Sequence, residues 1–130
     1  METHSEETLA TMIPSRHLDE PVREVDLTKA AQEAWAALDR TTPGHTARTL
    51  IKRPELRVVL MVLRKGAVIP EHTAEGDLTL HVLKGRVGVQ VEGEHRRLHA
   101  GHILAIEKLR PHAVEAFEDS EVLLNLGWPP

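Results

Sequence analysis

The sequence contains no cysteine and no tyrosine, and its other aromatic residues are few. Without cysteine the chain can form neither disulfides nor thiolate metal ligands, which fits a reducing compartment. Phenylalanine occurs once and tryptophan twice, so stacking platforms for single-stranded nucleic acid are not provided. The core must therefore be mainly aliphatic.

A basic stripe and a long apolar run are also missing. The 16 basic and 20 acidic side chains give a formal net charge of −4, and basic residues occur only in short pairs such as Arg96-Arg97. We therefore expect no nucleic-acid partner. No segment approaches the roughly 18 apolar residues that a membrane helix needs, and the acidic residues 1–7 do not resemble a secretory signal. We expect a cytoplasmic protein that does not associate with membranes.

A chain of 130 residues is long enough to bury one core but not two. Residues 1–24 mix charges with prolines and show no sustained period, which predicts an N-terminal tail. Its short apolar run at 9–13 could add an edge strand to a neighbouring molecule. Residues 25–130 then form a single domain.

One helix is predicted near the start of this domain. From Leu27 onward, apolar residues recur at three- and four-residue steps, which favours a helix over about 28–40. Asp26 or Thr28 can cap its first turn. We expect the apolar stripe to cover an outer face or an open end of a β-structure, and a helix that binds a partner is the alternative.

The rest of the domain is a succession of short strand candidates separated by turn residues. The run 56–63 is apolar at nearly every position, so we expect it to be buried on both faces. In the run 112–118, His112, Val114 and Ala116 share one face, which we expect to point inward. Many short strands with regular turn signals are typical of a sandwich or a barrel. The other candidates are about 67–71, 78–84, 86–92, 94–98, 103–107 and 121–127.

The first of two stretches that resemble the cupin superfamily begins at Gly66. The first cupin motif is Gly, five residues, His-x-His, three or four residues, Glu, six residues, Gly. This chain carries Gly66, His72 and Gly85 in register. Ala74 stands where the second histidine belongs, and Leu78 stands where the glutamate belongs.

The second stretch begins at Gly101 and is similar to the second cupin motif. That motif is Gly, five residues, Pro-x-Gly, two residues, His, three residues, Asn. His112 is in place, whereas Glu107 replaces the proline and Leu109 the glycine. Ala116 replaces the asparagine.

The resemblance covers about residues 50–127, with the motifs at about 66–85 and 101–116. Residues 86–100 look like the short connection of minimal cupins. The resemblance implies a mainly β fold, a double-stranded antiparallel β-barrel of the jelly-roll or RmlC-like type. Together with the predicted helix, this gives an all-β domain with one short N-terminal helix. Because such domains often pair, we expect a homodimer.

Cupins commonly hold a divalent metal, such as Fe, Mn, Ni, Cu or Zn, through three histidines and a glutamate. When these ligand positions are carried over to this chain, only two histidines of the set remain. They are His72 and, expected across the barrel from it, His112. Two imidazoles alone form an incomplete site, so we expect no tightly bound metal without help from other residues or waters. The residues weighed as substitutes, each expected in a turn or on the outer face, are Glu75, Asp77, His81 and His102.

Three functions stay open at this point. The leading hypothesis is a small stand-alone cupin with a degenerate metal site, acting as a ligand-binding or regulatory module for an unidentified small molecule. A metal-dependent enzyme, an oxygenase or an isomerase that uses His72 and His112, is the first alternative. A dimeric scaffold whose barrel is filled by its own side chains is the second. The predicted pocket-lining residues are Ala74, Leu78, Leu80, Val82, Val114 and Ala116.

Overall fold

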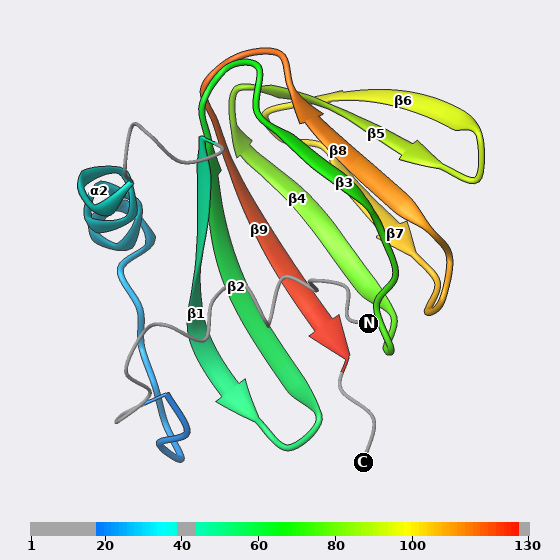
Figure 1. Ribbon diagram of the computed structural model, residues 1–130. Coiled ribbons are helices and arrows are strands. Elements are labelled where there is room, and N and C mark those ends of the chain that lie inside the picture. The colour runs from blue at the N-terminus through cyan, green and yellow to red at the C-terminus, as the bar shows by residue number, and fades with distance from the viewer. Residues whose placement is uncertain (1–17, 39–43, 128–130) are drawn as a thin grey trace.

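A computed structural model shows two antiparallel sheets that face each other, with a helix outside them (Figure 1). The structure describes residues 18–38 and 44–127, so the edge strand predicted at 9–13 lies outside the described residues. The elements are α2 (Leu27–Ala37), β1 (His45–Arg53), β2 (Leu56–Leu63), β3 (Val68–His72), β4 (Leu78–Lys84), β5 (Arg86–Val91), β6 (Glu94–His99), β7 (Ile103–Ile106), β8 (His112–Ala116) and β9 (Ser120–Gly127).

The strands form a five-stranded sheet in the order β1-β2-β9-β4-β7 and a four-stranded sheet in the order β3-β8-β5-β6. All of these pairings are antiparallel. The predicted all-β jelly-roll fold with a short helix is confirmed. The two sheets do not close into one continuous hydrogen-bonded barrel.

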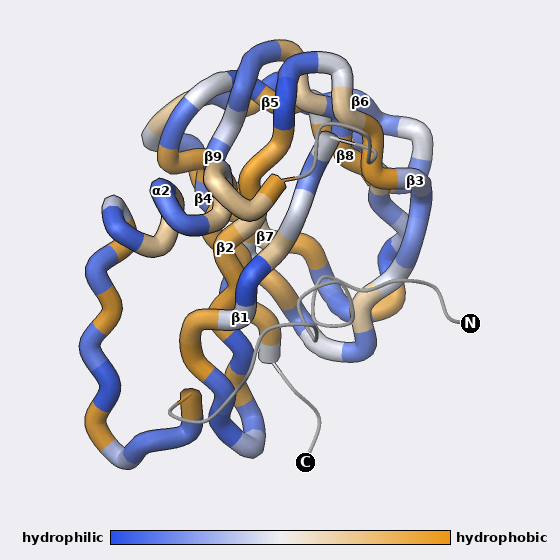
Figure 2. Tube along the Cα trace, turned by 60° about the vertical axis from the view of Figure 1, so that its left-hand side comes forward, coloured by the Kyte–Doolittle hydropathy of each residue, from blue (hydrophilic) through white to orange (hydrophobic). Residues whose placement is uncertain are grey.

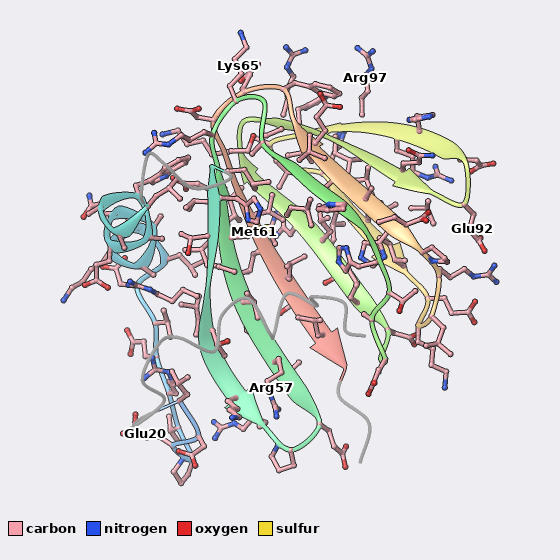
Figure 3. All side chains as sticks on the ribbon, viewed as in Figure 1. Glu20, Arg57, Met61, Lys65, Glu92 and Arg97 are labelled. Atoms are coloured by element: carbon pink, nitrogen blue, oxygen red, sulfur yellow. The ribbon has the colours of Figure 1, made fainter. Side chains whose placement is uncertain are left out.

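Strand β2 is buried on both faces, as its sequence predicted. Val59 and Met61 point into the aliphatic core between the sheets, where Figure 3 labels Met61. Leu60 points the other way and packs against Ala30 and Ala31 of α2. The helix therefore covers the outer face of the five-stranded sheet beside β1 and β2 (Figure 1).

Helix α2 begins one residue before the predicted start. The carboxylate of Asp26 caps it by accepting a hydrogen bond from the backbone amide of Lys29 at 3.1 Å. In the described part of the chain, no helix is long and apolar enough to cross a membrane.

Residues 18–24, which we assigned to the tail, lie against β1. The backbone amide of Lys52 donates to the carbonyl of Leu18 at 2.9 Å, and the Nε of Arg23 donates to the carbonyl of Leu50 at 2.6 Å. This part of the chain is therefore tied to the same sheet that α2 covers.

Strand β1 was not predicted. Its sequence mixes arginine and threonine with apolar residues, and a β-bulge shifts the pairing with β2 between Thr49 and Ile51. The bulge breaks the two-residue period that marks a strand in the sequence. Elsewhere the hydrophobic residues lie mainly along the strands and the turns are hydrophilic (Figure 2).

Candidate functional site

His72 and His112 lie side by side on neighbouring strands of the four-stranded sheet. They are register partners between β3 and β8, and their ring centroids are 4.3 Å apart with the ring planes tilted by 59°. The expectation that they face each other across the barrel is therefore wrong, because both strands belong to one sheet. This proximity lets both imidazoles contact the same small group.

A β-bulge in β3 turns His72 toward the interior. Ile69 faces the core, and in a regular strand a residue three positions later points to the opposite side. The pairing of β3 with β8 shifts between Ile69 and His72, with Pro70 and Glu71 exposed between them. The extra residue brings His72 back to the inner face, where it is only 5% exposed.

Regular alternation in β8 places His112 on the same inner face. His112, Val114 and Ala116 are buried, whereas Ala113 and Glu115 are not, as the sequence predicted. His112 is 1% exposed, and its register partner on the side away from β3 is Val91 of β5.

Backbone carbonyls orient both imidazole rings in the same way. The Nδ1 of His72 lies 2.9 Å from the carbonyl oxygen of Pro70, and the Nδ1 of His112 lies 3.0 Å from that of Arg110. A carbonyl oxygen only accepts, so Nδ1 is the donor in both rings, and Nε2 is the acceptor atom of each neutral ring. A ligand that brings donors or a positive charge would therefore meet the Nε2 side of each ring.

The other two positions of the cupin ligand set are apolar and packed. Ala74 and Leu78 are buried in the core and carry no donor atoms. Among residues 18–38 and 44–127, no group of three or more histidine, cysteine or acidic residues is placed to hold a metal ion. The residues present therefore do not fit the complete set of three histidines and a glutamate.

The residues weighed as substitutes lie elsewhere. Asp77 accepts a hydrogen bond from a backbone amide at 2.9 Å, and Glu75 is exposed before β4. His81 alternates with core-facing neighbours and so takes the outer face of β4. The Nδ1 of His102 accepts a hydrogen bond from the backbone amide of His99 at 3.0 Å.

The predicted pocket-lining residues share one environment. Each is at most 5% exposed, and all belong to the aliphatic core cluster between the sheets. They are Ala74, Leu78, Leu80, Val82, Val114 and Ala116. That they line a ligand pocket stays a prediction.

Sequence reasoning missed a cavity of about 350 Å³ between β5, β6 and β7. Its inner wall includes Val91, the register partner of His112, together with Leu104 and Ile106 from β7. Its rim is charged. No sequence signal could have found it, because segments distant in the chain supply the rim residues Glu92, Glu94, Arg96, Glu107 and Arg110.

A comparison with protein families now adds to this geometry. The family model Cupin_2, described as "Cupin domain", matches residues 59–125, a span that contains both histidines. The chain belongs to the cupin family. This cupin matches none of the curated proteins.

Solved structures share its fold. The SPY1581 protein of unknown function from Streptococcus pyogenes is 27% identical, with a TM-score of 0.68 over 87% of this chain and 93% of that one. KdgF from Halomonas sp. is 29% identical, with a TM-score of 0.64 over 71% and 86%. A salicylate 1,2-dioxygenase from Pseudoaminobacter salicylatoxidans is 19% identical, with a TM-score of 0.68 over 84% of this chain and 36% of that one. The last similarity concerns the fold alone.

Proposed function

We propose that this cupin is a small-molecule-binding or regulatory module whose ligand contacts the Nε2 atoms of His72 and His112. The observation that supports it best is the pair of buried imidazoles, oriented alike by backbone carbonyls, with apolar Ala74 and Leu78 in place of charged ligands. The ligand class that fits two acceptors within an aliphatic interior carries hydroxyl or amide donors on an apolar frame. In such a site the hydrogen bonds set the orientation and apolar burial supplies most of the affinity.

Elemental analysis of untreated protein tests the degenerate metal site. We expect substoichiometric metal and dissociation constants on the order of micromolar or weaker for Ni²⁺, Mn²⁺, Fe²⁺ and Zn²⁺, because two imidazoles supply only half of the usual ligand set. Near-stoichiometric metal in protein that was never exposed to added metal would overturn this part of the proposal.

A thermal-shift screen of hydroxylated and amide-bearing small molecules tests ligand binding. A true ligand should raise the melting temperature of the wild type, and His72→Ala or His112→Ala should abolish the shift. His99→Ala is the matched control, since that histidine is exposed at the end of β6 and should leave the shift unchanged. A ligand whose shift survives both inner substitutions binds somewhere else.

The second candidate is a metal-dependent cupin enzyme, an oxygenase or an isomerase. It is favoured by the donation of both Nδ1 atoms to backbone carbonyls, because metal-binding histidines are usually held in this way. It requires that His72→Ala and His112→Ala each remove metal and activity while the fold stays intact. Wild-type metal content in both variants would refute it.

The remaining expectations are proposals of the same kind. We propose that the protein is cytoplasmic and forms a homodimer, and light scattering on the purified chain tests the dimer directly. If neither the metal assay nor the ligand screen gives a signal at His72 and His112, the remaining hypothesis is a dimeric scaffold whose interior is filled by its own side chains.

A further inference from the structure

Residues 107–111, which we name the strap, connect β7 to β8 and end next to His112. The strap is tied on one side to the loop between β3 and β4. The backbone amide of Leu109 donates to the carbonyl of Ala74 at 2.9 Å, and that of Lys108 donates to the carboxylate of Asp77 at 2.9 Å. Two of its side chains also form part of the cavity rim.

On the other side, Arg110 joins the strap to the β5–β6 hairpin. Its Nη1 donates to both carboxylate oxygens of Glu92 at 2.9 and 3.0 Å, and its Nε and Nη2 donate to Glu107 at 3.0 and 2.9 Å. Glu92 lies at the tip of the hairpin (Figure 3). The hydrogen bonds to Glu107 and Glu92 raise the pKa of Arg110 above its already high ordinary value.

The same residue contacts His112 through its backbone. The carbonyl of Arg110 accepts the hydrogen bond from Nδ1 of His112, while its side chain lines the cavity. Movement of the strap away from the hairpin would therefore change the support of the His112 ring and displace two residues that line the cavity.

We propose that Arg110 is a positioning residue that holds the strap against the hairpin, limits access to the histidine pair and orients His112. Exposed ion pairs contribute little as a rule, but a network in which one arginine joins two carboxylates is a case in which they do contribute. Because these ion pairs are of modest strength, the strap can separate from the hairpin when a ligand approaches. The identity of the ligand rests on the proposed function. The effect of Arg110 on access to the two histidines does not.

Diethyl pyrocarbonate, which acylates neutral imidazole, tests this role of Arg110 without a ligand. The rate at each histidine is followed by mass spectrometry in the wild type, in Arg110→Gln and in Arg110→Lys. We expect His72 and His112 to react about fivefold faster in Arg110→Gln, which corresponds to losing exposed ion pairs of this kind. In Arg110→Lys, which keeps one ion pair, the rates at His72 and His112 should lie between those of the wild type and Arg110→Gln. His99 should react equally fast in all three proteins.

Arg86→Gln is the matched control. Arg86 forms a similarly exposed ion pair, with its Nε 2.7 Å from Glu118, but lies away from the strap. It should leave the rates of His72 and His112 unchanged. If Arg110→Gln proves unstable, the double variant Glu92→Gln with Glu107→Gln removes the same ion pairs and should also accelerate the reaction of both histidines. Wild-type rates in a folded Arg110→Gln or double variant would overturn the proposal, and a failed ligand screen would leave this result standing.

Discussion

Replacing Leu78 with glutamate tests whether the inner face keeps the geometry of a metal site. Leu78 stands at the glutamate position of the first cupin motif and is 3% exposed. A carboxylate introduced there loses the burial of leucine and adds a desolvated charge, so we expect Leu78→Glu to lower the free energy of unfolding by about 3 to 5 kcal/mol without metal.

With metal, the new carboxylate would join His72 and His112 in a three-ligand set. A divalent ion at about 100 times its dissociation constant stabilises the folded state by ~2.7 kcal/mol, which raises the melting temperature of a domain of this size by roughly 10 °C. Thermal unfolding with and without Ni²⁺ or Zn²⁺ measures this recovery.

The matched control is Leu80→Glu. Leu80 lies two residues along the same strand, on the same inner face, and is 2% exposed. It should lose similar stability and regain none with metal. If metal rescues both variants equally, or rescues neither, the assignment of position 78 to a ligand site is wrong.

Three further predictions concern the backbone and the pH dependence of stability. Leu109 has a φ of 66° and is 63% exposed, so Leu109→Gly should be more stable than Leu109→Ala by about 0.5 to 1 kcal/mol in chemical unfolding, the reverse of the usual order. Gly85→Ala should cost more than Gly93→Ala, because both glycines have positive φ but only a Cβ at Gly85 meets backbone and side-chain atoms within 3 Å. Burial lowers the pKa of His45, so the unfolded chain binds the proton more readily and stability should fall as the pH drops through about 6.5. His45→Gln should flatten that fall in thermal unfolding between pH 7.5 and about 5.5.

Each of these has an outcome that contradicts it. An alanine at position 109 as stable as glycine would mean that the left-handed backbone is not strained. Equal losses at Gly85 and Gly93 would mean that the neighbouring chain moves away at no cost. An unchanged pH profile in His45→Gln would assign the acid sensitivity to other histidines.

Most of the fold could be predicted because local signals agree with it. Strand β4 has the predicted bounds, and glycines with positive φ end the strands at Gly66, Gly85 and Gly101. The alternation in β8 correctly predicted that His112 points inward. The missed strand β1 and the bulge before His72 have one cause. An extra residue in one strand is defined by its partner strand, which the local sequence does not record.

The chemistry of the site depends on two backbone features that the motif spacing does not encode. The bulge in β3 supplies the carbonyl that orients His72, and the strap supplies the one that orients His112. Because the two rings have separate supports, a change in the strap should disturb His112 directly and His72 only through access. The side-chain types at 74 and 78 argue against a complete metal site, whereas the two carbonyls hold both imidazoles in one orientation. Under the proposed role of Arg110, ligand selectivity would depend on the strap as much as on the interior.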